Sequence, residues 1–520
     1  MQPIDYEIRE KIIESEGNIV VSASAGTGKT YTTIQKIKYE VDKGHAYRTF
    51  AAITFTRKAA KEINNKAGIN KSEGFIGTND NFVLKEIIYP FMHDVYGREY
   101  KKELKPDFSN EKQIKDFDEG IKKIKDTGFV CKYSDNKKNF SFQLALNILK
   151  NSEAARLYMK AKYYRIYIDE YQDSDRDMHN LFMYICKELE IPLFIVGDLK
   201  QSIYGWRGGY VEGFRCILRD SEFHRYELKH NFRSVMAIQN YANIFMDDVR
   251  VDFRKINFHR EVCCFAYKKI KYALAKLKNW INNNEGCAFL IRKKSDAIKW
   301  TEYMKNEGLS FMYIPNSPLD NSDLESEHIW ISRQIASYIL NDLYSEFDFY
   351  DEIPNSDAYN FSRVKRMLQN IENNVDCEEK FKEDCKKLYL FLGYDENERV
   401  YNEINVLFDV ISDQKYIPTY NSEQYEHIVT TIHGSKGLQY KQVIILADNY
   451  NLNNEEDCNL HYVAVTRPEQ RLLVLCNYTT HNGKLYCKKI VENVKKVRKN
   501  EIDAQVSDVA ECINSEEFDK

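Results

Sequence analysis

The stretch Ala23-Ser24-Ala25-Gly26-Thr27-Gly28-Lys29-Thr30 decides the fold of this chain. It follows a short apolar run, Asn18-Ile19-Val20-Val21, and precedes a helical pattern. Glycines let a backbone wrap closely around phosphate oxygens, Lys29 adds a positive charge, and Thr30 can ligate Mg²⁺. Ala23 stands where the full Walker pattern has glycine, but the preceding strand and the Gly-Lys-Thr ending favour a phosphate loop over a plain glycine-rich turn.

Further apolar runs of strand length recur along the chain in two groups. They cover residues 51–55, 166–168 and 193–196, and then residues 287–291, 442–446 and 471–475. Runs that are apolar at every position are typical of parallel strands buried on both faces of a sheet. The sequence therefore predicts an α/β protein with two parallel-sheet lobes.

The composition is that of a soluble globular protein with several domains. The 520 residues are 43% hydrophobic and 30% charged, and no run of about 18 apolar residues predicts a membrane span. The N-terminal residues lack a secretory signal, so we expect a cytoplasmic protein. The 12 cysteines have no metal-ligand spacing, which indicates free thiols. Because the net charge is −4, any nucleic-acid binding must come from a local groove.

An acidic stretch, Asp169-Glu170-Tyr171-Gln172-Asp173, follows the strand pattern of residues 164–168. Beside a phosphate loop, one carboxylate can hold Mg²⁺ while the next orients the attacking water. Asp175 and Asp177 raise the alternative of a calcium loop, but the required glycine and final glutamate are absent. The acidic pair therefore predicts phosphate chemistry.

A second glycine-framed loop follows the apolar run of residues 193–196. It reads Gly197-Asp198-Leu199-Lys200-Gln201-Ser202-Ile203-Tyr204-Gly205-Trp206-Arg207-Gly208-Gly209. Its amide can reach a phosphate, and its aromatic side chains can stack on nucleobases. We interpret the loop as an element that couples phosphate binding to nucleobase binding.

Together these stretches resemble the superfamily 1 DNA helicases of the UvrD/Rep/PcrA type. Residues 54–63 resemble motif Ia, 77–82 motif Ib, 231–234 motif IV, 433–440 motif V and 462–467 motif VI, in family order. The resemblance implies two RecA-like lobes with two small, mainly helical insertions. The implied boundaries are 1–88 and 159–232 for lobe 1A, 89–158 for subdomain 1B, 233–312 and 427–487 for lobe 2A, 313–426 for subdomain 2B, and 488–520 for a charged C-terminal segment.

The resemblance also implies roles for individual residues. The implied catalytic residues are Lys29, Asp169, Glu170, Gln201, Arg233 and Arg467, with Glu170 as the base and the two arginines as fingers. ATP would contact residues 23–30, Phe232 and Gln439, and Mg²⁺ would contact Thr30 and Asp169. The implied DNA contacts are Phe55, Thr56, Lys58, Thr78, Phe82, Tyr204, Trp206, Arg207 and His433. Ile8 replaces the family's adenine-reading glutamine, so other NTPs are expected as substrates.

Stretches partly outside these motifs, residues 75–80, 138–146 and 169–183, resemble the helicase-like subunits of Gabija anti-phage systems. The helicase resemblance implies a DNA-dependent ATPase with 3′-to-5′ polarity that acts on DNA with single-stranded regions or ends, and the Gabija resemblance implies a bacterial defence role for it. Its implied partner is an OLD-family nuclease with a TOPRIM active site (GajA-like), in a hetero-oligomer. Two alternatives stay open: a stand-alone repair helicase, and a structural scaffold for a nuclease.

Overall fold

The structure is a computed structural model that describes residues 4–55, 59–60, 63–64, 66, 74–100, 104–107, 113–205, 208–321, 324, 326, 328–354, 356–499 and 502–514. The chain divides into two compact units. The first contains Met1–Leu104, Ile114–Lys269 and Ile445–Lys520, and the second contains Lys105–Gln113 and Ile270–Ile444. Within the described residues, no helix is both long and apolar enough to cross a membrane.

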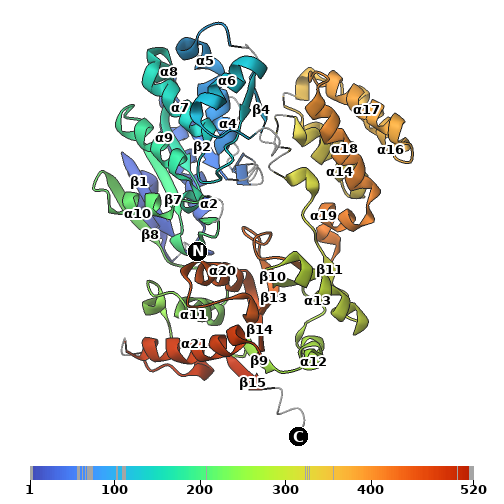
Figure 1. Ribbon diagram of the computed structural model, residues 1–520. Helices are drawn as coiled ribbons and strands as arrows, with labels where there is room; N and C mark the ends of the chain where they lie inside the picture. The colour runs from blue at the N-terminus through green and yellow to red at the C-terminus, as the bar shows by residue number, and fades with distance from the viewer. Residues whose placement is uncertain are drawn as a thin grey trace. The chain divides into compact units, whose positions relative to one another are not determined.

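A six-stranded sheet in the first unit has the order β3-β2-β6-β7-β1-β8 (blue to green in Figure 1). Its strands are β1 (Asn18–Ala23), β2 (Thr49–Thr54), β3 (Gly74–Thr78), β6 (Tyr163–Ile168), β7 (Leu193–Gly197) and β8 (Phe223–Leu228). All adjacent pairs are parallel. The strand predictions for β1, β2, β6 and β7 are therefore confirmed.

Apolar cores cover both faces of this sheet, as parallel strands require. Val20 of β1 belongs to one core, whereas its neighbours Ile19 and Val21 belong to the other. The helices around the sheet are α1 (Tyr6–Glu14), α2 (Lys29–Lys43), α4 (Asn79–Val83), α5 (Tyr89–Tyr96), α6 (Phe117–Thr127), α7 (Phe140–Asn151), α8 (Glu153–Lys162), α9 (Arg176–Lys187) and α10 (Val211–Arg219), with the π-helix η1 (Leu84–Ile88). The short strand β5 (Phe129–Cys131) lies in this unit, and the short strand β4 (Lys105–Asp107) lies in the second unit.

A seven-stranded sheet has the order β11-β12-β10-β13-β14-β9-β15. Its strands are β9 (Val262–Tyr267), β10 (Cys287–Ile291), β11 (Met312–Tyr313), β12 (His427–Thr431), β13 (Tyr440–Leu446), β14 (Pro468–Asn477) and β15 (Glu511–Asn514). Its helices are α11 (Met236–Ile244), α12 (Ile270–Trp280), α13 (Lys294–Asn306), α20 (Glu455–Val465) and α21 (His481–Arg498). The predicted boundary at residue 488 is wrong, because it falls inside α21 and because β15 is a strand of this sheet.

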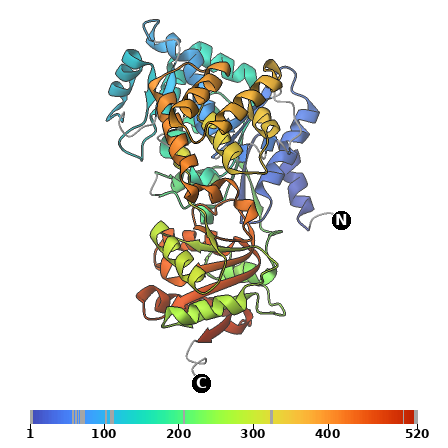
Figure 2. The ribbon, with the colours of Figure 1, turned by 90° about the vertical axis from the view of Figure 1, so that its right-hand side faces the viewer.

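Helices of the second unit form a separate bundle (yellow to orange in Figure 2). They are α14 (Ile329–Leu340), α15 (Glu346–Glu352), α16 (Phe361–Asn373), α17 (Glu378–Phe391), α18 (Glu398–Ser412) and α19 (Ile417–Tyr420). Side chains such as Ile335, Leu368 and Leu407 are fully buried in its core. The bundle lies in the chain between β11 and β12, so the fold is the predicted α/β class: two RecA-like parallel sheets with helical insertions.

Candidate nucleotide site and nucleic-acid loop

Three functional loops of the first unit leave the same edge of its parallel sheet. The phosphate loop follows β1, the acidic stretch follows β6, and the loop that contains Gln201 follows β7. Because β7 lies between β1 and β6, the Gln201 loop begins between the other two. Ligands of open α/β sheets bind at this edge, where the strands have their carboxyl ends.

The phosphate loop is tightly fitted against the segment after β8. Gly26 has φ +72, and a Cβ there would lie 2.2 Å from Asn231 Oδ1. The Phe232 amide donates to the Gly26 carbonyl at 2.9 Å. Lys29 Nζ donates to the Ala23 carbonyl at 3.2 Å and lies 4.0 Å from Glu170 Oε1. The lysine is thus held at the loop, facing the acidic stretch.

Arg9 of α1 is a site residue that the sequence did not reveal. Its guanidinium is buried, pairs with Asp5 at 2.8 Å, and donates to the Thr27 carbonyl at 2.6 Å. It also lies 5.3 Å from the ring centroid of Phe232, which is 50% exposed. Arg9 therefore connects the phosphate loop to the aromatic ring predicted to stack on the base. The neighbouring Ile8 is partly buried against an apolar core, and its side chain has no hydrogen-bonding group with which to read a base.

The acidic stretch places its two carboxylates differently. Asp169 is 4% exposed, and its Oδ1 accepts from the Glu170 amide at 2.9 Å. Glu170 has φ +53, a left-handed conformation that is strained for any residue but glycine, asparagine or aspartate. Its side chain accepts a hydrogen bond from the buried amide of Gln172. The buried carboxylate is thus that of Asp169, and the carboxylate of Glu170 is held in place by the hydrogen bond from Gln172.

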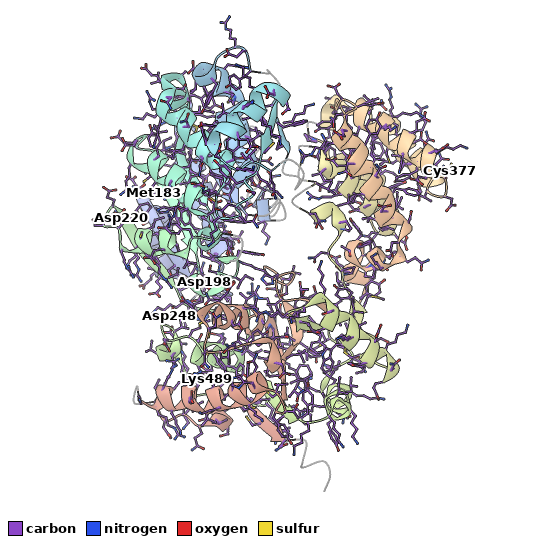
Figure 3. The ribbon with its side chains drawn as sticks, in the orientation of Figure 1. Met183, Asp198, Asp220, Asp248, Cys377 and Lys489 are labelled. Carbon is purple, nitrogen blue, oxygen red and sulfur yellow. The ribbon has the colours of Figure 1, made fainter. Side chains whose placement is uncertain are left out.

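Gln201 lies at the centre of a buried hydrogen-bonded chain. Its Nε2 donates to Asp198 Oδ2 at 2.7 Å, and its Oε1 accepts from Arg467 Nη2 at 3.3 Å. Asp198, labelled in Figure 3, also pairs with Lys200 Nζ at 3.1 Å. Burial lowers the pKa of Lys200, but Asp198, Tyr462 and Asp248 together more than reverse this and leave the pKa above its ordinary value. The predicted phosphate sensor and one predicted arginine finger are thus in direct contact.

The second predicted arginine finger, Arg233, is held by the residue that precedes Arg467. Its Nη1 donates to the Thr466 carbonyl at 3.2 Å, next to Arg467 in the chain. Burial lowers the pKa of Arg233, whereas the carboxylates of Glu469 and Glu170 oppose that shift.

The predicted DNA-stacking loop returns to the acidic stretch. Gly209 forms an isolated antiparallel bridge with Asp175, and the Tyr210 amide donates to the Ser174 carbonyl at 2.7 Å. A Cβ at Gly208 would lie 2.5 Å from the Asn136 carbonyl oxygen, so the loop also abuts the predicted subdomain 1B. Tyr204 is half-buried. The loop therefore starts at the end of β7 and returns to residues 174–175, next to the acidic stretch.

Subdomain 1B is tied to the start of α9 by carboxylates. The Asn139 amide and the Gln143 side chain donate to Asp177 Oδ2 at 2.8 Å and 3.0 Å. Asn139 Nδ2 donates to Asp175 Oδ2 at 3.0 Å. These acids, which raised the alternative of a calcium loop, are therefore occupied by protein amides. Within the described residues, no group of three or more His, Cys, Asp or Glu side chains is placed to hold a metal ion.

The remaining predicted DNA contacts differ in outcome. Phe82 is wrong as a DNA contact, because it is 0% exposed and packs in the core against Phe75 and Phe182. Phe55 is half-buried, and the Thr78 hydroxyl caps α4. Four other predicted DNA contacts lie outside the described residues: Thr56, Lys58, Trp206 and Arg207. The last predicted DNA contact, His433, belongs to the second unit, as does the predicted nucleotide contact Gln439.

The residues predicted to hold Mg²⁺ have suitable chemistry. Thr30 supplies a hydroxyl oxygen and Asp169 a carboxylate oxygen, and Mg²⁺ prefers oxygen ligands, usually one or two from protein with substrate phosphates completing the shell. The hydrogen bond from the Glu170 amide fixes the orientation of the Asp169 carboxylate. The donor set therefore fits a magnesium nucleotide.

A cavity of about 480 Å³ lies beside the Gln201 loop, away from the phosphate loop. Its lining includes Lys200, Arg215, Arg250, Asp248 and Lys489. Asp248 and Lys489, labelled in Figure 3, come from segments far apart in the sequence. None of the residues predicted to contact nucleotide lines this cavity.

Comparisons with known proteins agree with this geometry. The UvrD/REP helicase N-terminal domain model matches residues 5–143 and 98–222, and the UvrD-like helicase C-terminal domain model matches residues 427–475. The ATP-dependent DNA helicase PcrA of Staphylococcus aureus strain Mu50 is 25% identical over 287 residues, which cover 46% of this chain and 39% of PcrA. These similarities define the class as UvrD-like helicases.

The Gabija protein GajB of Bacillus cereus strain VD045 is 37% identical over 477 residues, which cover 90% of this chain and 94% of that protein. The chain therefore belongs to the UvrD-like helicase family, and within it to the group that contains the Gabija protein GajB.

Proposed function

We propose that this protein is a motor that hydrolyses ATP, and other NTPs, when it binds DNA with a single-stranded region or end. The observation that carries the proposal is the position of Gln201. It contacts Arg467 at 3.3 Å and lies on the same loop as the aromatic residues predicted to stack on bases. A single loop is therefore in a position to respond to both nucleotide and DNA.

In this proposal the phosphate loop of residues 23–30 binds the triphosphate, with Phe232 stacked on the base. Glu170 orients and deprotonates the attacking water, and Gln201, Arg233 and Arg467 stabilise the charge that develops on the transferred phosphoryl group. Thr30 and Asp169 hold Mg²⁺, which neutralises phosphate charge when it is bound. Phe55, Tyr204 and Trp206 stack on single-stranded bases, and each contributes about 1–3 kcal/mol.

The biological role follows from the relationship to GajB. We place the chain in the cytoplasm of a bacterium, as the DNA-sensing subunit of a Gabija-type anti-phage system. Its partner is an OLD-family nuclease with a TOPRIM active site, in a hetero-oligomer. The 3′-to-5′ polarity is part of the same proposal.

Two variants test the hydrolytic centre. Lys29→Ala and Glu170→Gln should abolish DNA-stimulated hydrolysis while single-strand binding stays within about threefold of wild type, since neither side chain is a proposed DNA contact. Wild-type turnover by Lys29→Ala would refute the assignment. Strand displacement by the isolated chain on duplexes with 3′ or 5′ tails tests polarity, and efficient unwinding without a partner would favour the stand-alone repair helicase. Copurification with a TOPRIM nuclease from the native host tests the partnership.

A further inference from the structure

Gln172 belongs to the acidic stretch, where it is fully buried on a single 3-10 turn, η3 (Tyr171–Asp173), beside the Gln201 loop. Its Nε2 donates to Glu170 Oε2, and its Oε1 accepts from the Asp198 amide at 2.9 Å. Its own carbonyl accepts from the Ser202 hydroxyl at 3.3 Å. One residue therefore bonds to the proposed base and, through two bonds, to the loop of the phosphate sensor.

The amide of Gln172 has one acceptable orientation. In the opposite orientation its oxygen would face the Glu170 carboxylate and its NH₂ would face the Asp198 N–H, so that both contacts would be repulsive. The contacts made by Glu170 and Asp198 therefore fix the amide, and the amide in turn fixes the Glu170 carboxylate.

Packing reinforces this position. A Cβ at Gly197 would lie 2.8 Å from Gln172 Oε1 and 2.8 Å from Phe214 Cζ, so the last residue of β7 leaves the space that the glutamine occupies. Glu170 is restrained at both ends, by its left-handed backbone and by the bond from Gln172. Its other oxygen, Oε1, lies 4.0 Å from Lys29 Nζ.

We infer that Gln172 is the positioning residue that sets the direction of the Glu170 carboxylate and links it to the Gln201 loop. The inference rests on the proposed role of Glu170 as the base. A displacement of Asp198 or Ser202 moves their bonds to Gln172, and Gln172 carries Glu170 with it. Alignment of the attacking water thus depends on the loop that also holds Gln201.

Gln172→Glu is the decisive variant. An ionised glutamate retains an acceptor for the Asp198 amide but cannot donate to Glu170, and its charge repels that carboxylate. We expect kcat to fall by about 10²-fold, the order of loss that a misplaced catalytic group produces. The KM for nucleotide and the affinity for single-stranded DNA should stay within about twofold, because Gln172 is not a proposed contact of either.

Gln442→Glu is the matched control. Gln442 is also fully buried, and its amide bonds to Asn282 and Glu285 within the second unit. It should unfold at a lower temperature with an unchanged kcat. A neutral variant, Gln172→Met, covers the case in which Gln172→Glu does not fold, and the same fall in kcat is expected.

A wild-type kcat in Gln172→Glu or Gln172→Met would overturn the inference, and so would an equal fall in Gln442→Glu. Its failure is separable from failure of the proposed function. Wild-type turnover by Glu170→Gln would show that Glu170 is not the catalytic base and would refute the proposed function. An inactive Glu170→Gln beside fully active Gln172 variants would refute only the positioning role.

Discussion

Arg467 Nη2 donates a hydrogen bond of 3.3 Å to the side-chain oxygen of Gln201, although 266 residues separate the two in the sequence. Both side chains are buried, at 1% and 4% exposure. Charges removed from water interact more strongly than charges at a surface. The contact therefore places a strong, desolvated positive charge at the residue proposed to sense the terminal phosphate.

Replacement of Arg467 should act on turnover rather than on nucleotide binding. Arg467→Ala removes a proposed arginine finger, and such groups contribute about 10³–10⁵ in rate. We expect kcat to fall in that range, as measured by steady-state hydrolysis with saturating DNA. Arg219→Ala, at a side chain that is 75% exposed, should be neutral. Less than a tenfold fall in Arg467→Ala would contradict a catalytic role.

Gly26→Ala should weaken both folding and nucleotide binding. The added Cβ would meet Asn231 Oδ1 at 2.2 Å, and the left-handed backbone disfavours alanine. Gly44→Ala is the control, since Gly44 has φ +75 but nothing within 4 Å of an added Cβ. Thermal unfolding and nucleotide titration should show a larger loss for Gly26→Ala. Equal losses would mean that backbone strain alone, and not the contact with Asn231, decides the effect.

Lys200→Met should destabilise the first unit strongly. It removes the ammonium group 3.1 Å from the Asp198 carboxylate, which is 0% exposed. A buried charge left without its partner costs about 3–5 kcal/mol. Asp248→Asn removes the other carboxylate near Lys200, but this one is 62% exposed, so a loss of about 1 kcal/mol or less is expected. Denaturant titration measures both, and equal effects would refute the argument.

Stability should fall below neutral pH partly because of His461. Burial lowers the pKa of His461 from 6.5 to about 3, and its Nε2 lies 2.6 Å from the Tyr486 hydroxyl. Between these two values the unfolded chain binds the proton and the folded chain does not. The free energy of unfolding therefore decreases as pH falls from 6.5 towards 3, by at most about 1.4 kcal/mol per pH unit.

Removal of the imidazole isolates this contribution. His461→Gln should show a shallower dependence of stability on pH than wild type over the same range. Denaturant titrations at several pH values give both slopes. Identical slopes would mean that other groups account for the acid sensitivity.

The sequence revealed the central strands of the first sheet but not its edges. β1 and β7 are buried on both faces and are therefore apolar at nearly every position. β3 and β8 are the edge strands, and β8 is buried only at its two ends, with Arg225 and Glu227 exposed between them. An edge strand faces solvent along one side, so it lacks the continuous apolar run that identifies its neighbours.

The residues of the candidate site likewise fall into those that the sequence revealed and those that it did not. Lys29, Asp169 and Gln201 were predictable because each follows a buried strand at the carboxyl edge of the sheet. Arg9 and Gln172 were not, because their roles depend on burial and on contacts with distant segments. Phe82 was assigned wrongly for the same reason, since α4 directs the ring into the core.

The fit of Gly26 against Asn231 and Phe232 has a consequence for biosynthesis. The Ser24 amide donates to Leu228 of β8, and the Gly26 carbonyl accepts from Phe232, so the phosphate loop is completed by chain made much later. The region that matches the helicase N-terminal domain ends at residue 222, before β8 begins. A nascent chain stopped there would lack the strand that holds the loop. The contacts that hold the phosphate loop against residues 228 and 232 can therefore form only after residue 232 has left the ribosome.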